Sequence, residues 1–172
     1  MSASAEMPYF IKPSVPLSAT EKEAAYAQAH AAIQATLGEE EDELLKMVTI
    51  NSLLKTFLPY FYWVGFYLVR GERELVVGPY QGTLGCLTIQ FGRGVCGAVA
   101  ASGQTKIVAD THALQQGKEH IACDPNSRSE IVLPVRRRAD GSLLGVFDVD
   151  STLVGSFDGV DQRWLEKILA TF

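Results

Sequence analysis

The chain of 172 residues carries three cysteines, and their thiols are its strongest candidates for chemistry. Cys86 follows a glycine-containing segment, Cys96 lies near the expected start of a helix beside Arg93, and Cys123 precedes turn-forming residues. A helix N-terminus and a nearby arginine both favour the thiolate, which is the nucleophilic form of cysteine. We therefore predict thiol chemistry. A single cysteine is more often a small buried side chain, and for Cys96 that alternative has about equal weight.

Zinc binding is a second interpretation of the same residues. Cys86, Cys96, Cys123 and His120 offer four side chains of the type that zinc prefers. Structural zinc sites usually contain a closely spaced pair of ligands, and no two of these cysteines form a Cys-x-x-Cys pair. We therefore expect neither a metal nor another cofactor.

Three carboxylic acids lie in strongly apolar surroundings. Asp148 and Asp150 are two residues apart on an expected strand, so their side chains share one face, and Glu130 opens another apolar strand. Like charges on one face repel unless a ligand, a cation or a proton compensates them. These acids are candidates for substrate binding. Exposure at the ends of the strands is the alternative, with about equal weight for Asp150.

Aromatic side chains supply a possible wall for a binding site. Trp63, Gly65 and Tyr67 alternate along an expected strand, and Gly65 leaves space between the two large rings. Such a pair can hold a methyl or thioether group, although ordinary core packing is the commoner role of paired rings.

The elements that must position these residues follow from hydrophobic spacing and turn signals. Ser18 and Glu21 form a capping-box pattern that begins the first helix. The order of elements predicts a single α+β domain at 18–172, an antiparallel sheet of about six strands with helices packed on it, and an extended arm at 1–17. The expected helices cover 19–37, 42–57, 94–102 and 157–172, the expected strands cover 60–69, 74–77, 87–91, 105–108, 130–137 and 142–150, and 110–128 is an expected long loop.

The composition restricts the partners of the protein. The net charge of −5 provides no basic surface for nucleic acid or anionic membranes, and no apolar run reaches the roughly 20 residues of a membrane helix. An odd number of cysteines without a secretory leader favours a cytoplasmic protein with reduced thiols. A small-molecule ligand is expected, and a homodimer is compatible with the sequence.

Six ordered motifs resemble those of free methionine-(R)-sulfoxide reductases, which are built on a GAF domain. The resemblance extends over roughly residues 20–170 and includes all three cysteines. Its motifs lie at 63–67, 78–82, 91–97, 120–124, 127–132 and 145–151.

The resemblance implies reduction of free L-methionine (R)-sulfoxide through a cysteine sulfenic acid and an intramolecular disulfide, with thioredoxin as the reductant. It implies that Cys123 is the attacking thiol, Cys86 its disulfide partner and Cys96 an additional thiol, with the roles of Cys123 and Cys96 open to exchange. Trp63 and Tyr67 would enclose the methyl end of the substrate. The polar end and the sulfoxide oxygen would be bound by Glu130, Asp148 and Asp150. The alternative function is a GAF domain that senses a small ligand without catalysis.

Overall fold

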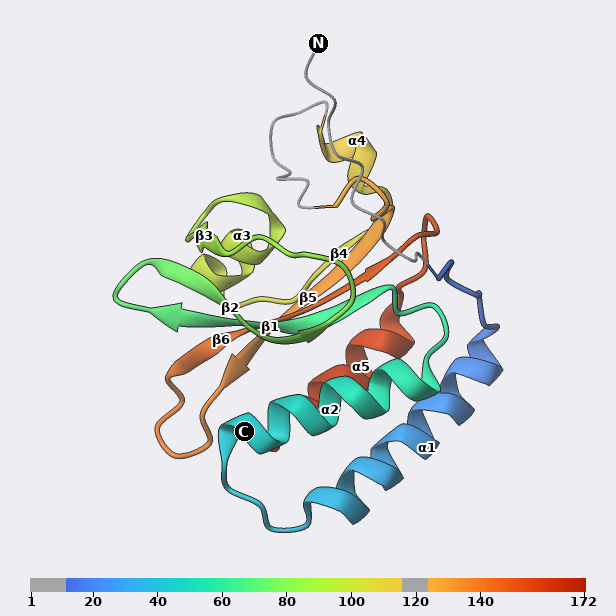
Figure 1. Ribbon diagram of the computed structural model, residues 1–172, viewed down its shortest axis with the longest axis horizontal. Coiled ribbons are helices and arrows are strands. Elements are labelled where there is room, and N and C mark those ends of the chain that lie inside the picture. Colours follow the sequence, from blue (N-terminus) through green and yellow to red (C-terminus); the bar gives the residue numbers. More distant parts are fainter. Residues whose placement is uncertain (1–11, 116–123) are drawn as a thin grey trace.

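The computed structural model describes residues 12–115 and 124–172 and contains one antiparallel sheet in the order β3-β2-β1-β6-β5-β4 (Figure 1). The two long central strands, β1 and β6, pair with each other, and β5 extends the sheet beside β6. This arrangement confirms the predicted α+β class and the predicted six-stranded sheet. The strands are β1 (Trp63–Arg70), β2 (Glu74–Gln81), β3 (Thr88–Gln90), β4 (Lys106–Val108), β5 (Ser129–Arg136) and β6 (Leu143–Ser151).

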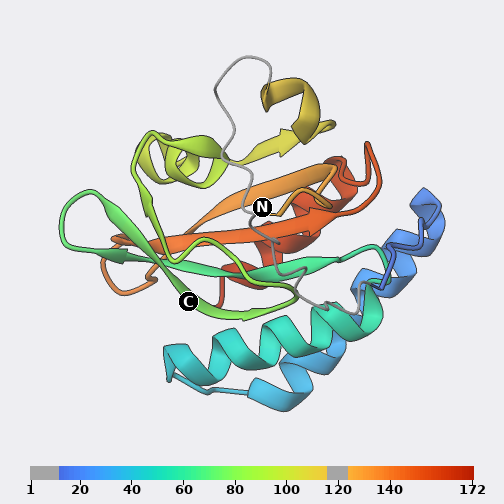
Figure 2. The same ribbon diagram turned by 45° about the horizontal axis from the view of Figure 1, so that its top comes forward.

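Helices cover both faces of the sheet. One face carries the three longest helices, and the other carries two shorter helices together with the connecting loops (Figures 1 and 2). The helices are α1 (Ala19–Leu37), α2 (Glu43–Phe57) and α5 (Gly159–Leu169) on the first face, and α3 (Gly94–Ser102) and α4 (Thr111–Gln115) on the second.

The alternation of side chains along the central strands separates two hydrophobic cores. In β1, Val64 and Phe66 face the core beneath α1, α2 and α5, whereas Trp63 and Tyr67 belong to the core beneath α3. Because successive residues of a strand point to opposite faces, the sequence alternation alone assigns these positions. The second core is where the predicted site residues gather.

Local capping signals fix the ends of the helices. The Ser18 hydroxyl accepts a hydrogen bond from the Glu21 backbone N–H, and the Glu21 carboxylate accepts one from the Ser18 N–H, so the predicted capping box is confirmed. Asp158 caps α5 in the same reciprocal way. The expected loop at 110–128 differs in part, because Asp110 accepts a hydrogen bond from the His112 N–H and the short helix α4 follows.

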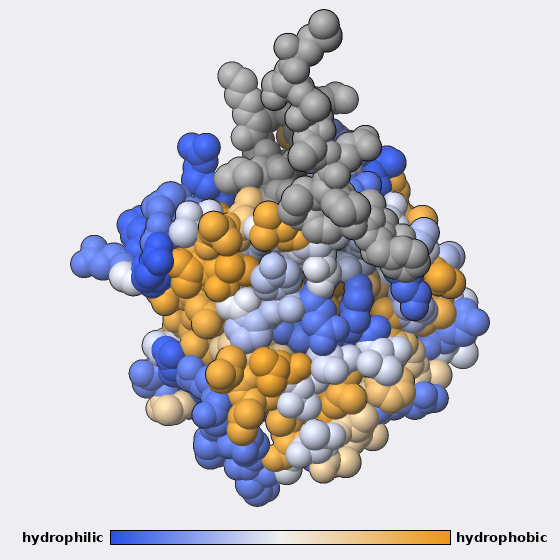
Figure 3. All heavy atoms as spheres, viewed as in Figure 1, coloured by the Kyte–Doolittle hydropathy of each residue, from blue (hydrophilic) through white to orange (hydrophobic). Residues whose placement is uncertain are grey.

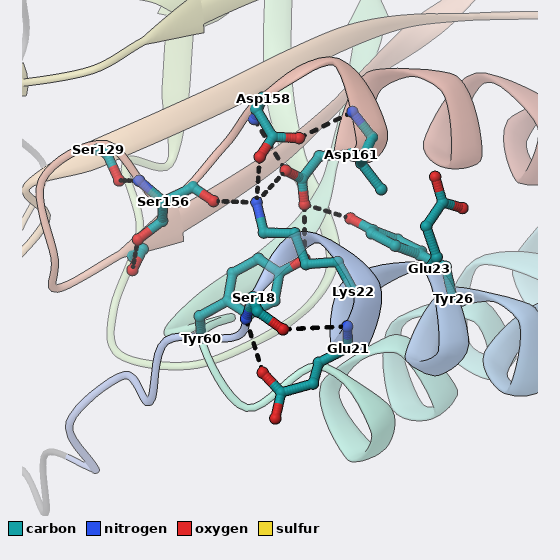
Figure 4. A network of polar contacts seen from close by, with 12 residues as sticks. Ser18, Glu21, Lys22, Glu23, Tyr26, Tyr60, Ser129, Ser156, Asp158 and Asp161 are labelled. Carbon is teal, nitrogen blue, oxygen red and sulfur yellow. Dashed lines mark hydrogen bonds and ion pairs between the residues drawn. The ribbon is translucent and has the colours of Figure 1, made fainter.

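A buried polar network joins α1 to α5 on the helical face (Figure 4). The Lys22 ammonium donates to the Asp161 carboxylate at 2.6 Å, to Asp158 at 2.9 Å and to the Ser156 carbonyl at 2.6 Å. The hydroxyls of Tyr26 and Tyr60 donate to the other Asp161 oxygen at 2.8 and 2.6 Å. Asp161 is fully buried, and a cation with several donors compensates its charge. We refer to these residues as the Lys22 network.

The surface shows several separate hydrophobic patches among hydrophilic residues on the face viewed in Figure 3. Among the described helices, none is both long and apolar enough to cross a membrane. Residues 12–17 form neither helix nor strand, yet Ser14 donates through its hydroxyl to the Tyr60 carbonyl at 2.9 Å. The division into an arm and a domain at residue 18 remains a prediction.

Candidate active site

A pocket opens on the α3 face of the sheet, at the end of the central strands. Its cavity volume is about 50 Å³. The walls combine aromatic rings from β1, the first turn of α3 and carboxylic acids from β5 and β6. The lining residues are Tyr62, Trp63, Tyr67, Leu84, Gly85, Ile89, Arg93, Gly94, Cys96, Asp124, Ser127, Glu130, Asp148 and Asp150.

Three carboxyl groups meet in this pocket because of the strand register. Glu130 of β5 pairs with Asp150 of β6, and Asp150 pairs in turn with Trp63 of β1. Asp148 lies two residues before Asp150 and therefore on the same face. Glu130 and Asp148 are buried, with exposed fractions of 4% and 6%. All three predicted acids thus line one pocket, and we refer to them with Cys96 as the acid cluster.

The acids of the cluster hold protons more tightly than ordinary carboxyl groups. Burial, followed by the charges of Asp148 and Asp150, raises the pKa of Glu130. Burial and the charge of Asp150 likewise raise the pKa of Asp148, and burial raises the pKa of Asp150 to about 7. Arg93 is the one basic residue among the described residues that line the pocket. The cluster therefore provides proton donors near neutral pH.

Cys96 differs from the sequence-based expectation. It lies in the first turn of α3, as predicted, but it is buried, and burial together with the charges of Asp148 and Glu130 raises its pKa. The expected thiolate is therefore wrong for this residue, because burial and then two acids from distant strands outweigh the helix N-terminus and Arg93. Cys96 is a protonated thiol within the acid cluster.

The cluster also has the geometry of a set of metal ligands. One sulfur or oxygen atom from each of Cys96, Glu130 and Asp148 lies within 4.8 Å of the others. Burial and the neighbouring acids raise the pKa of all three groups, which favours their protonated forms. Of the four zinc ligands considered from the sequence, Cys123 and His120 lie outside the described residues.

An aromatic wall lies beside the acids on the same face of the sheet, since Trp63 pairs with Asp150. The rings of Trp63 and Tyr67 stack with centroids 5.7 Å apart, and Tyr80 stacks on Trp63 at 5.1 Å. The space expected above Gly65 is occupied, because a Cβ atom there would come within 2.3 Å of the Tyr80 Cβ. Gly65 thus permits close packing of Tyr80 on the wall.

The remaining predicted site residues are two cysteines. Cys86 is half-buried beside the aromatic wall, and it takes part in a disulfide bond. The Tyr67 hydroxyl forms a hydrogen bond with the Cys86 backbone. Cys123 lies outside the described residues, directly before Asp124 in the sequence.

Three polar pocket residues were given no role from the sequence. The Ser127 hydroxyl donates to Asp150, which lowers the pKa of that acid against the effect of burial. Tyr62 and Asp124 hydrogen-bond to each other at 2.8 Å. Asp124 and Ser127 lie in motifs that the resemblance includes, so their positions carried a signal. Their partners are distant in sequence and could not be inferred.

Comparisons with known proteins agree with this geometry. The GAF domain family model matches residues 39–172. Free methionine-R-sulfoxide reductase from Escherichia coli is 37% identical over 84% of each chain. The chain belongs to the GAF-domain family of free methionine-R-sulfoxide reductases.

Other relatives of this chain have less specific names. GAF domain-containing protein A from Dictyostelium discoideum is 40% identical over 89% of this chain and 93% of its own length. Among solved structures, free methionine-R-sulfoxide reductase from Neisseria meningitidis in complex with its substrate is 38% identical, covers 92% of both chains and superposes with a TM-score of 0.80. The fold is therefore shared along almost the whole chain.

Proposed function

We propose that this protein reduces free L-methionine (R)-sulfoxide to methionine with cysteine thiols. The observation that carries the proposal is the acid cluster: Glu130, Asp148 and Asp150 line one aromatic-walled pocket with raised pKa values. Family membership supports the same reaction, since the Escherichia coli and Neisseria relatives are named for it.

The reaction requires a thiolate that attacks the sulfoxide sulfur and an acid that protonates the sulfoxide oxygen. The Cys123 thiolate attacks the sulfoxide sulfur, while a protonated acid of the cluster donates to the oxygen. The sulfur–oxygen bond breaks, methionine leaves, and the oxygen remains on Cys123 as a sulfenic acid. The substrate sulfur gains two electrons and the cysteine sulfur loses two, so the step balances.

A second thiol then resets the oxidised cysteine. The Cys86 thiol attacks the sulfenic acid, a disulfide forms and water leaves. Thioredoxin, or another dithiol, reduces this disulfide by exchange. Because such a cycle requires a reducing compartment, we place the protein in the cytoplasm. Cys96 acts as an additional thiol, and its raised pKa favours Cys123 as the nucleophile.

Substrate selection follows from the two sides of the pocket. Trp63 and Tyr67 enclose the methyl end, and the acids pair with the free ammonium group. A methionine within a peptide lacks that ammonium, so it leaves the acids without a partner, and such mismatches are strongly disfavoured. The same pocket therefore accounts for selectivity for the free amino acid.

The test is steady-state reduction of free methionine (R)-sulfoxide with dithiothreitol, compared with the (S) form and with N-acetylmethionine sulfoxide. We expect activity on the free (R) form, loss of activity in Cys123→Ser and residual activity in Cys96→Ser. Replacement of dithiothreitol by thioredoxin and its reductase tests the reductant. Substrate binding without turnover in folded, reduced protein would instead support a ligand-sensing domain.

A further inference from the structure

The Asp124 carboxylate joins three segments that are distant in sequence. It accepts hydrogen bonds from the Tyr62 hydroxyl at 2.8 Å, from the Thr83 hydroxyl, and from the backbone and side-chain nitrogens of Asn126 at 2.9 Å each. Tyr62 directly precedes β1, and Thr83 lies in the segment between β2 and β3. We refer to these four residues as the Asp124 junction.

The junction depends on an ionised carboxylate. Four donors point at the two oxygens of Asp124, and the hydrogen bonds from Thr83, Asn126 and Tyr62 outweigh partial burial, so the pKa of Asp124 is lowered. Because a carboxylate has only acceptor sites, it accepts all four bonds. An asparagine presents an amide in place of one oxygen, so it cannot satisfy every donor.

The junction is also connected to the aromatic wall. The indole N–H of Trp63 donates to the Thr83 carbonyl at 3.0 Å. The neighbouring Gly82 has φ +136°, and a Cβ atom there would come within 2.7 Å of the Trp63 ring. The segment that leads to Cys86 is therefore packed tightly against a side chain that lines the pocket.

We infer that Asp124 is a positioning residue for disulfide formation. This inference rests on the proposed function. Thr83 is three residues before Cys86, and Asp124 directly follows Cys123, so one carboxylate ties together the two segments that carry the reacting sulfurs. Disulfide closure requires the two Cα atoms to come within about 4.4–6.8 Å of each other. The structure has this junction with Cys86 in a disulfide bond. By the inference, the same hydrogen bonds in the reduced protein hold the two segments at a short separation before the sulfenic acid and the Cys86 thiol condense.

Asp140 provides a matched control within the same chain. It accepts a hydrogen bond from the backbone N–H two residues later, at Ser142, as Asp124 does at Asn126. It lies in the β5–β6 turn, at the opposite end of these strands from the pair Glu130 and Asp150. Asp140→Asn therefore reproduces the loss of charge at a turn without affecting either cysteine segment.

The experiment is a single turnover of fully reduced protein with free methionine (R)-sulfoxide and no external reductant. Methionine release, trapping of sulfenic acid with dimedone, and disulfide formation are followed separately after rapid quenching. For Asp124→Asn we expect disulfide formation to slow by about tenfold or more, since misplacement of reacting groups strongly reduces rates. Methionine release should slow much less than disulfide formation, and the dimedone adduct should accumulate. Asp140→Asn should behave as the wild type.

Two milder variants control for misfolding of Asp124→Asn. Thr83→Val and Tyr62→Phe each remove one donor, and both should slow disulfide formation in the same direction but less strongly. Disulfide formation at the wild-type rate in these variants and in Asp124→Asn would overturn the inference. An equal fall in the rates of methionine release and disulfide formation would overturn it as well. Failure of the wild type to release methionine would instead refute the proposed function.

Discussion

Asp161 and Asp148 are both buried aspartates of the same domain, and they lie on opposite faces of its sheet. Asp161 accepts hydrogen bonds from Lys22, Tyr26 and Tyr60 within the Lys22 network. Asp148 is surrounded by other acids and a thiol, and its Oδ1 atom has no hydrogen-bond partner among the described residues. One carboxylate is compensated by a cation and the other by protons.

This difference distinguishes structural from functional burial of charge. A buried ion pair with complete hydrogen bonding holds two helices together, and loss of one partner leaves an uncompensated charge. A cluster of like charges without a cation costs stability, and it persists where a ligand or a reaction uses it. The comparison therefore supports the proposed catalytic role of the acid cluster and a structural role of the Lys22 network.

The largest effect is expected for Asp148→Asn. By the proposed function this acid binds substrate and supplies protons, so its loss should lower kcat/KM by about 10²–10⁴. The same change removes the free-energy cost of protonating this acid in the folded protein at neutral pH, so the free energy of unfolding should rise by about 1–3 kcal/mol. Steady-state kinetics and urea denaturation measure the two effects. A large fall in stability would contradict the comparison.

The matched change in the Lys22 network is Asp161→Asn. It leaves the Lys22 ammonium buried without its closest charged partner, and the free energy of unfolding should fall by about 3–5 kcal/mol. Activity per folded molecule should remain close to that of the wild type. Urea denaturation at pH 7, with kinetics at a temperature where the variant is folded, tests both statements. A selective loss of kcat in the folded variant would show that the network contributes to catalysis.

The pH dependence of stability sharpens the comparison further. The pKa of Asp150 is raised from 3.8 to about 7 in the folded protein, so the folded state binds an extra proton between these values. Because stability falls with rising pH wherever the folded state binds more protons, the contribution of Asp150 is lost as pH rises from about 4 to about 7. Asp150→Asn should therefore flatten the stability curve in this range. If the free energy of unfolding changed equally steeply with pH in the variant and the wild type, the raised pKa of Asp150 would be contradicted.

The smallest effect is expected for Ser127→Ala. Its hydroxyl donates to Asp150 and lowers the pKa of that acid, so removal of the hydroxyl should raise the pKa. The alkaline limb of the kcat/KM profile should move to higher pH, with a change of about tenfold or less at pH 7. A shift of that limb to lower pH would mean that another group controls it.

The sequence predicted features that depend on local rules. The capping box of Ser18 and Glu21 defines the start of α1, and the two-residue spacing of Asp148 and Asp150 places them on one face. Both features depend on residues within one turn of helix or a few residues of strand. The family resemblance added the grouping of cysteines and acids. Cys96 and the three acids line the pocket, whereas Cys86 is not among its lining residues.

Features that depend on distant segments could not be predicted. The pKa of Cys96 is raised by Asp148 and Glu130, which reach α3 only after the sheet is assembled. The hydrogen bonds of Asp124 likewise come from residues on other elements. Sequence spacing gives no information about such neighbours, because they are set by tertiary packing.

The most direct test of the central claim is a single turnover of the fully reduced protein. Pre-reduced wild type is mixed with excess free methionine (R)-sulfoxide in the absence of reductant, and methionine and remaining thiols are quantified. The account predicts that each molecule releases one methionine and loses two of its three thiols. Release of no methionine from folded, reduced protein, with all thiols retained, would contradict the claim that the acid cluster and the cysteines form a reductase site.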